Sequence, residues 1–392
     1  MLKEVSINDL VVGMYVHSIA TQDGNLKIKS RGLVTSWATI DELKSKGIKS
    51  LIIDPAKQKQ RQKSEQPDVI PDEEKDVAVS YDAEIGRARF LHEQGKSLCK
   101  RLLVSLEQGE GIDAAITDDL AGRIVASSRR NNDALMTLTR IREKGAYLME
   151  HATNVSVLMA NFAAAMEMDE KVIHEMTMAG LLHDLGMIKT ADDILNSTTR
   201  LNESQWQSVR QHVIAGVDEL KELEGVPEST LTAIAQHHER IDGSGYPNGL
   251  KGEEISLFGR MLAIADSYDA MTAERPYKKA VPPNKALKTL LQADNHFDML
   301  LVQKFVKCVG IYPTGSLVKL DNGKVAMVIK QNEKNPLQPR IKVFYSLTGG
   351  HYLSPKEYDL STPRMNVDIE KSVLPQELGI DFNRFFNESI AG

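Results

Sequence analysis

The chain has 392 residues, and because domains usually hold about 100–200 residues each, two or three domains are expected. Its net charge of -6 argues against a generally basic surface of the kind that coats nucleic acid, so we expect no DNA partner. The two cysteines, Cys99 and Cys308, offer neither a disulfide framework nor a thiolate metal motif, and with no signal peptide and no run of about 20 apolar residues the chain is expected to be cytoplasmic, without a membrane span.

The first 140 residues are predicted to contain a small folded unit, a linker and a helical connector. Residues 1–54 read as an α/β domain, with strand-like runs at 10–16 and 48–53 and a short helix at 39–46 that ends at Gly47. Residues 55–80 are rich in Lys, Gln, Glu and Pro, which is typical of a linker. Residues 81–140 are interpreted as a helical connector, because 87–106 and 114–127 can each place apolar side chains on one face.

Residues 141–312 are predicted to form an all-α domain, and residues 313–392 a C-terminal β extension and tail. The clearest helices span 151–168, 171–185, 203–223, 227–238 and 258–272. Beyond Pro313, residues 316–329 read as a hairpin around Asp321-Asn322-Gly323, and residues 341–347 offer a third strand. The predicted fold is therefore multidomain, with an all-α helical bundle preceded by a small α/β domain and followed by a short β-hairpin extension.

Histidines and aspartates gather in the helical region at positions where apolar residues are expected. Asp184 ends the run MAGLLHD, and Asp266 follows the apolar run MLAIA inside another predicted helix. A buried, ionised carboxylate is costly unless it is paired or binds a metal, and no lysine or arginine is adjacent in the sequence. The candidate ligands are His151, His183, Asp184, His212, His237, His238 and Asp266.

Seven ligands exceed what one catalytic ion with open positions can use, so we expect two divalent ions bridged by a carboxylate and a water. Imidazole and carboxylate suit Fe, Mn, Zn, Ni or Co, and the absence of thiolates gives no reason to favour structural Zn. A single histidine on an apolar face is more often an ordinary core residue than a ligand, and it is the grouping of all seven that favours a metal centre. The histidines outside this group of seven are interpreted as surface or structural residues: His17, His92, His174, His296 and His351.

Two further motifs flank these ligands. In HHERIDGSGYP, the residues Gly243, Gly245 and Pro247 predict a tight turn that returns Tyr246 toward the paired histidines. In DSYDAMTAERPYKK, basic residues follow Asp266 and could bind phosphate: Arg275, Lys278 and Lys279. Taken alone, the first motif could be an ordinary loop with a packing tyrosine and the second a solvated helix end.

Together these motifs resemble the HD-GYP domain, a branch of the HD superfamily of metal-dependent phosphohydrolases, over about residues 140–312. The resemblance implies hydrolysis of a cyclic dinucleotide, cyclic di-GMP or 3'3'-cyclic GMP-AMP, to the linear dinucleotide through a metal-bridging hydroxide. It implies two divalent ions, most often Fe or Mn, held by the seven ligands named above, with Asp184 as the bridge. It counts His183, Asp184 and Asp269 among the catalytic residues, and it assigns substrate contacts to Gly243, Tyr246, Arg275 and Lys278.

Two positions depart from the family pattern. The usual HDxGK reads His183-Asp184-Leu185-Gly186-Met187, so the lysine expected near the scissile phosphate is missing, and Lys189 is the nearest candidate to replace it as a catalytic residue. Members with three metals carry a glutamate one turn before the first histidine, where this chain has Tyr147, which is a poor ligand at neutral pH. We therefore expect two metals rather than three.

Other readings stay open at this point. The chain could be a catalytically weak or inactive sensor that binds a cyclic dinucleotide and signals through protein partners, and the missing lysine at Met187 favours this. A nucleotide hydrolase of the broader HD group would leave the Gly243–Pro247 loop unexplained. The first residues also resemble the domain of unknown function DUF3391, which we interpret as a regulatory domain with a protein partner or a small ligand as input. The helical stretch at 85–145 could form a homodimer interface.

Overall fold

The computed structural model describes residues 2–7, 10, 14–22, 32–34, 43, 48–55, 57, 77–108, 114–142, 147–195, 197, 199–274, 279–332, 334–362 and 367–389. The chain divides into two compact units, residues 1–74 and residues 75–392. Among the described residues, no helix combines the length and the apolar character needed to cross a membrane.

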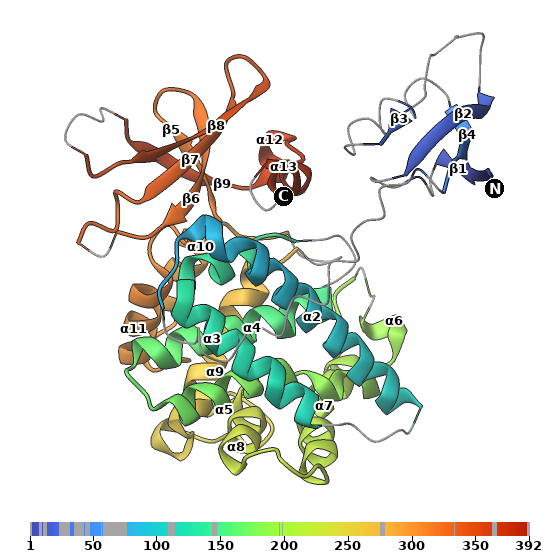
Figure 1. The fold of residues 1–392 in the computed structure, drawn as a ribbon. Helices are drawn as coiled ribbons and strands as arrows, with labels where there is room; N and C mark the ends of the chain where they lie inside the picture. Colours follow the sequence, from blue (N-terminus) through green and yellow to red (C-terminus); the bar gives the residue numbers. More distant parts are fainter. Residues whose placement is uncertain are drawn as a thin grey trace. The chain divides into compact units, whose positions relative to one another are not determined.

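The first unit contains a small antiparallel sheet, shown in blue in Figure 1. Its strands lie in the order β1-β4-β2-β3, and their bounds are β1 Lys3–Ser6, β2 Tyr15–Gln22, β3 Gly32–Leu33 and β4 Ile48–Ile53. β4 has the predicted bounds and its Leu51 is fully buried, whereas the helix expected at 39–46 lies almost wholly outside the described residues.

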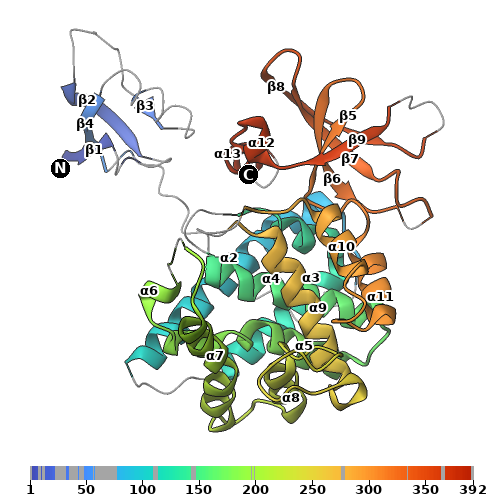
Figure 2. The same ribbon diagram turned by 180° about the vertical axis from the view of Figure 1, so that it is seen from behind.

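The second unit is mainly helical. Its helices are α2 Tyr81–Glu107, α3 Ala114–Leu138, α4 Tyr147–Ala165, α5 Glu170–Leu182, η3 Leu185–Lys189, α6 Asp192–Leu195, α7 Glu203–Lys221, α8 Glu228–Gln236, η4 Gly252–Glu254, α9 Leu257–Thr272, α10 Pro283–Leu291 and α11 Met299–Val309. α4 packs against α2, α3, α5 and α9, and Figures 1 and 2 show it among them. Every residue of α4 from Glu150 to Ala163 is buried, as is typical of a central helix.

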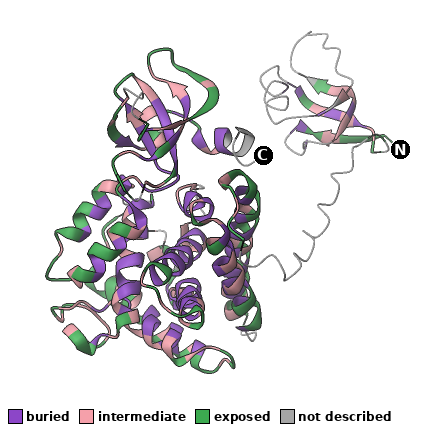
Figure 3. Ribbon diagram, turned by 60° about the vertical axis from the view of Figure 1, so that its left-hand side comes forward, coloured by how far each residue is buried: buried purple, intermediate pink, exposed green. Residues whose placement is uncertain are grey.

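The helices within 81–140, predicted as a helical connector, pack directly onto the central helices. Glu84 in α2 is fully buried and accepts hydrogen bonds from Arg130 and Ser127 in α3, which compensates the buried charge. His92 in α2 lies 2.8 Å from the Asn154 side chain in α4. Figure 3 shows buried residues gathered inside the helical part and exposed residues on its outer helices.

A five-stranded antiparallel sheet follows the helices, in the order β8-β7-β6-β5-β9. Its elements and the two helices after it are β5 Leu317–Leu320, β6 Lys324–Lys330, β7 Arg340–Ser346, β8 His351–Asp359, β9 Ile369–Val373, α12 Pro375–Leu378 and α13 Phe382–Ser389. The predicted hairpin is β5–β6, which turns at Gly323 with φ +73°. The sheet is larger than the predicted short extension, because the mostly exposed β8 lacks the apolar alternation that indicates a strand.

Candidate metal centre

All seven predicted ligands meet at one place in the helical unit. His151 comes from α4, His212 from α7 and Asp266 from α9, while the other four follow the ends of α5 and α8. They form two neighbouring groups. Within each group, the ligand atoms all lie within 4.8 Å of one another. One group is Asp184, His212, His237 and His238, and the other is His151, His183 and Asp266.

Asp184 belongs to the first group and presents one carboxylate oxygen to the histidines of each group. Its Oδ1 is 3.4 Å from Nε2 of His212 and 3.9 Å from Nε2 of His237. Its Oδ2 is 3.6 Å from Nε2 of His151 and 3.5 Å from Nε2 of His183. This is the arrangement that a carboxylate needs in order to bridge two cations.

Asp266 also reaches both groups. Its Oδ1 is 3.1 Å from Nε2 of His151, and its Oδ2 is 3.8 Å from Nδ1 of His238. Because the described side chains within ion-pair distance of both carboxylates are imidazoles, a cation is the partner that would compensate their burial.

Four histidines each donate a hydrogen bond from Nδ1, which turns Nε2 toward the cluster. Nδ1 of His183 lies 2.9 Å from the Gly180 carbonyl oxygen, and His212 and His237 make the same contact to the carbonyl three residues earlier, each at 2.6 Å. A carbonyl only accepts, so Nδ1 carries the proton and donates it, and Nε2 faces the cluster with its lone pair. His151 is oriented in the same way by a carboxylate, since its Nδ1 lies 2.8 Å from Oδ2 of Asp269.

Helix ends add to the attraction for cations. His183 is the residue that caps the C-terminus of α5, and His237 caps the C-terminus of α8. The C-terminal end of a helix carries a partial negative charge from its unpaired carbonyl groups. Two such ends at one site favour bound positive charge.

The electrostatics of the site match neutral His237 and His238 and an ionised Asp184, whereas the carboxylates beside His151 favour its charged form. Burial, together with the neighbouring histidines, lowers the pKa of His237 to about 3 and holds the pKa of His238 well below its usual value. Burial opposes ionisation of Asp184, yet the surrounding histidines still hold its pKa below the usual value. For His151, burial lowers the pKa but the bonded carboxylates of Asp266 and Asp269 outweigh it and raise the pKa to about 10.

These residues fit divalent metals of the Fe, Mn, Co, Ni and Zn class. Five imidazoles and two carboxylates supply nitrogen and oxygen donors and no thiolate, as this class of ions accepts. The ring of Tyr147, on which the prediction of two metals rather than three was based, stacks on His151 with centroids 5.3 Å apart.

Asp269 is held by two arginines that the sequence analysis did not single out. Arg142 donates from Nη2 to Oδ1 of Asp269 at 2.5 Å, and Nη2 of Arg140 lies 3.9 Å from the same oxygen. Asp269 in turn fixes His151, so a chain of contacts runs from the arginines to the cluster. Their spacing in TRIREK reads as an ordinary solvated segment, and no sequence signal indicated that they turn inward.

The Gly-Tyr-Pro loop returns to the histidines as predicted. The Tyr246 ring stacks on the His238 ring with centroids 4.6 Å apart, and Gly243 takes the positive φ of +81° that favours glycine. Glu239 anchors the loop, because its carboxylate accepts hydrogen bonds from the amides of Asn248 and Leu250. The sequence analysis missed this role, although the position directly after the paired histidines was a signal.

Two of the basic residues expected to contact phosphate cannot be placed, and a further one lies near the loop. Arg275 and Lys278 lie outside the described residues. Lys189 pairs through Nζ with Glu219 at 2.9 Å, and its role as a replacement for the lysine missing at Met187 stays a prediction. Arg210 of α7, which the sequence analysis did not select, lies over the Tyr246 ring at 5.6 Å and has a half-exposed side chain.

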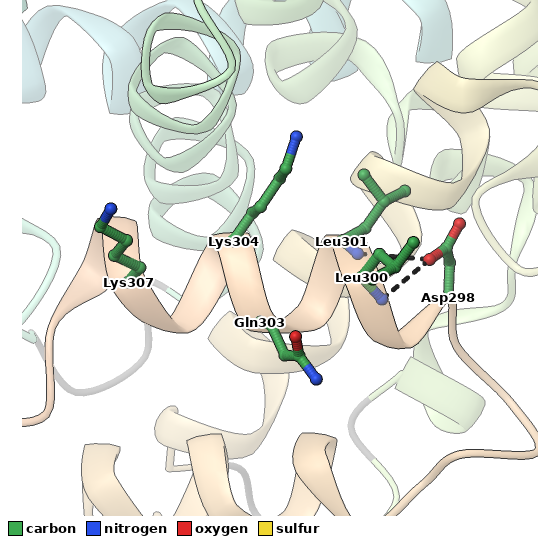
Figure 4. Close-up of a pocket in the computed structure, with 6 residues that line it drawn as sticks. All are labelled: Asp298, Leu300, Leu301, Gln303, Lys304 and Lys307. Atoms are coloured by element: carbon green, nitrogen blue, oxygen red, sulfur yellow. Dashed lines mark hydrogen bonds between the residues drawn. The ribbon is translucent and has the colours of Figure 1, made fainter.

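A separate hollow over α11 shares no residue with the histidine cluster (Figure 4). Asp298 begins this helix and accepts from the amides of Leu300 and Leu301. Lys304 and Lys307 extend from the same helix. Among the described residues that line the hollow, Asp298 supplies the one carboxylate, and it already caps the helix and pairs with Arg260. These residues therefore offer no set of metal donors.

Three family models match the chain. The HD domain matches residues 135–301, the domain of unknown function DUF3391 matches residues 2–116, and the KOW domain associated with HD domain matches residues 317–380. The last of these corresponds to the five-stranded sheet, which the sequence analysis did not identify as a domain type.

Similar proteins carry names that concern cyclic dinucleotides. The chain is 34% identical over 355 residues to the protein named cyclic di-GMP phosphodiesterase PA4108 of Pseudomonas aeruginosa, covering 88% of this chain and 86% of that protein. It is 37% identical over 145 residues to 3'3'-cGAMP-specific phosphodiesterase 3 of Vibrio cholerae, covering 37% of this chain and 31% of that protein. A solved structure, Bd1817, a HDG"Y"P protein from Bdellovibrio bacteriovorus, shares the fold with a TM-score of 0.52 at 17% identity, covering 78% of this chain and 98% of that one.

Proposed function

The chain belongs to the HD-GYP family, and we propose from this premise that it is a metal-dependent phosphodiesterase that hydrolyses a cyclic dinucleotide to the linear dinucleotide. The observation that carries the proposal is the position of Asp184, which presents Oδ1 to two histidines and Oδ2 to two others. Two divalent ions, Fe or Mn by the donor set and the family, would be held by the seven ligands.

When bound, such a pair of ions activates water at neutral pH and neutralises charge on the reacting phosphate. The protein itself contributes orientation. Asp269 keeps the proton on Nδ1 of His151, and the backbone carbonyls do the same for His183, His212 and His237. The ligands therefore need little rearrangement when metal and substrate bind.

Substrate contacts are assigned to the residues at the edge of the cluster. Tyr246 stacks on His238 with a ring that could pack against a base or ribose, and Gly243 shapes its loop. Arg210 adds a positive charge beside Tyr246 that can meet a phosphate. Arg275 and Lys278 are retained as phosphate contacts on the strength of the sequence motif alone.

The substrate is cyclic di-GMP or 3'3'-cyclic GMP-AMP. The similarity to PA4108 over 86% of that protein favours cyclic di-GMP, because the match to the 3'3'-cGAMP-specific relative spans only 31% of that protein. A homodimer through residues 85–145 and protein partners of the N-terminal domain stay predictions.

The test is to incubate Mn- or Fe-loaded protein with each cyclic dinucleotide and to separate the products by chromatography. We expect a linear dinucleotide from wild type and none from Asp184→Ala, since Asp184 presents one oxygen to two histidines of each group. Asp118→Ala is the matched control, because Asp118 is an exposed aspartate that pairs with His174 on the surface of the same unit. Absence of product from both substrates with either metal would refute the proposal.

The alternative is a catalytically weak or inactive sensor of the same ligand, and one observation favours it. Met187 stands where the family lysine is expected, and the nearby Lys189 is already paired with Glu219. If slow turnover results from the missing charge, Met187→Lys should raise kcat at unchanged metal content. An unchanged kcat would show that this position does not limit the rate.

A further inference from the structure

A small cavity lies behind the metal centre, where the helical bundle meets the C-terminal sheet. Its volume is about 50 Å³, and its lining includes Thr272 at the end of α9, Ser316 next to β5, Val373 in β9 and Phe382 in α13. The segment from 374 to 382 covers this side, and Asn383 bonds through its side chain to the Arg142 carbonyl oxygen. All these residues belong to one compact unit.

Among the described residues that line the cavity, the charged ones are two arginines and none is a carboxylate. The Arg140 side chain is 6% exposed and the Arg142 side chain 19% exposed. Arg140 already donates to the Thr139 and Thr272 hydroxyls and stacks on Tyr268, yet its Nη2 has no hydrogen-bond partner. Nη1 of Arg142 likewise has none.

The two guanidinium groups share one acidic partner in the part of the chain that the structure describes. That partner is Asp269, which also accepts from Nδ1 of His151. Arginine stays protonated in proteins, so two buried positive charges face one carboxylate. Because an uncompensated buried charge is costly, this surplus favours a bound anion.

We propose that this cavity is a binding site for a small oxyanion of the size of inorganic phosphate. The planar fork of a guanidinium matches two oxygens of phosphate or sulfate, which favours an oxyanion over chloride. One water needs about 10–15 Å³, so the cavity holds one such anion or a few waters. The cavity volume is far below the several hundred Å³ that a nucleotide-sized ligand requires, so this cavity is too small to be the substrate site.

An anion in this cavity would affect two other parts of the protein. The anion would join Arg140 and Arg142 to the C-terminal segment around Val373–Phe382, and so strengthen the contact between the bundle and the sheet. Arg142 also holds Asp269, so the anion and the carboxylate that orients His151 use the same guanidinium. The inference does not depend on which substrate the metal centre takes.

The test is calorimetric titration of inorganic phosphate into the metal-loaded full chain, with ionic strength held constant by sodium chloride. We expect a site that sulfate competes for and that Arg140→Gln weakens by on the order of tenfold or more, because a charge-assisted contact is lost. Arg129→Gln is the matched control, since Arg129 is an exposed arginine paired with Glu170, and its phosphate affinity should equal that of wild type. Equal phosphate affinity of Arg140→Gln and wild type would overturn the proposal. The absence of any heat of phosphate binding in wild type would also overturn it, because the cavity would then hold only water.

Hydrogen exchange on wild type locates the site without any variant, and it remains informative if Arg140→Gln does not fold. Phosphate should slow amide exchange in residues 372–383 relative to chloride at the same ionic strength. Slowed exchange confined to the metal ligands around 183–184, with 372–383 unchanged, would place the phosphate at the metal centre and refute the second site.

Discussion

Replacing Gly186 by alanine should disrupt the metal centre without removing a single ligand. Gly186 lies in η3 directly after His183-Asp184, and η3 packs against α7, which carries His212. A Cβ built at Gly186 would lie 2.5 Å from the Gly216 amide nitrogen and closer still to the His212 carbonyl oxygen. Backbone atoms cannot be avoided by a rotamer change, so η3 and α7 must separate by roughly 1 Å.

That separation acts on the contact between Oδ1 of Asp184 and Nε2 of His212, now 3.4 Å apart. A misplacement of about 1 Å near reacting groups can cost on the order of a hundredfold in rate. We therefore expect Gly186→Ala to lower kcat/KM for the cyclic dinucleotide by about 10–100-fold and to lower the metal content measured by elemental analysis.

Gly122→Ala controls for the change of residue type. Gly122 lies in α3, and an added Cβ there meets the His174 ring at 3.5 Å, which is ordinary contact. This variant should keep the wild-type kcat/KM and metal content. Gly186→Ala with a wild-type metal content and kcat/KM would refute the close-packing argument.

Three further perturbations test other parts of the site. Asp269→Asn should weaken metal binding by about 10–100-fold, because Asp269 orients His151; equal metal affinity in a competition assay with a chelator would contradict this. Glu239→Gln should raise KM more than it lowers kcat, since the anchor of the Tyr246 loop is weakened while the ligands stay; steady-state kinetics with unchanged KM would speak against it. Burial lowers the pKa of His92 to about 4, although the hydrogen bond that His92 donates to the Asn154 side-chain oxygen opposes this shift. The unfolded chain therefore binds more protons between about pH 6.5 and 4, and stability falls as pH falls through that window, by up to about 3 kcal/mol. Denaturant unfolding should show a smaller acid loss in His92→Gln than in wild type, and identical pH dependence would exclude this role of His92.

The metal centre could be predicted from the sequence because its residues break the local pattern. Asp184 and Asp266 interrupt apolar runs, and the structure buries both among histidines, with side chains 14% and 9% exposed. The loop motif was likewise readable, since glycine and proline restrict the backbone strongly enough to predict a turn. The structure places Tyr246 on His238 as that turn requires.

Residues that support the ligands could not be predicted, because their role depends on contacts between distant segments. Arg142 and Asp269 are 127 positions apart, and nothing local distinguishes Arg142 from a solvated arginine. Glu239 accepts from amides 9 and 11 residues later, which requires the path of the loop to be known. The five-stranded sheet was underestimated for a similar reason, since the exposed β8 is defined by its pairing with β7 and carries little apolar periodicity.

Anomalous diffraction from crystals of the Mn-loaded protein tests the central claim most directly. The account predicts two peaks, about 3.5–4 Å apart, one on each side of the Asp184 carboxylate. One peak bound by His212, His237 and His238 and the other by His151, His183 and Asp266 would match the two groups of ligands. A single peak, or peaks that do not contact Asp184, would contradict it.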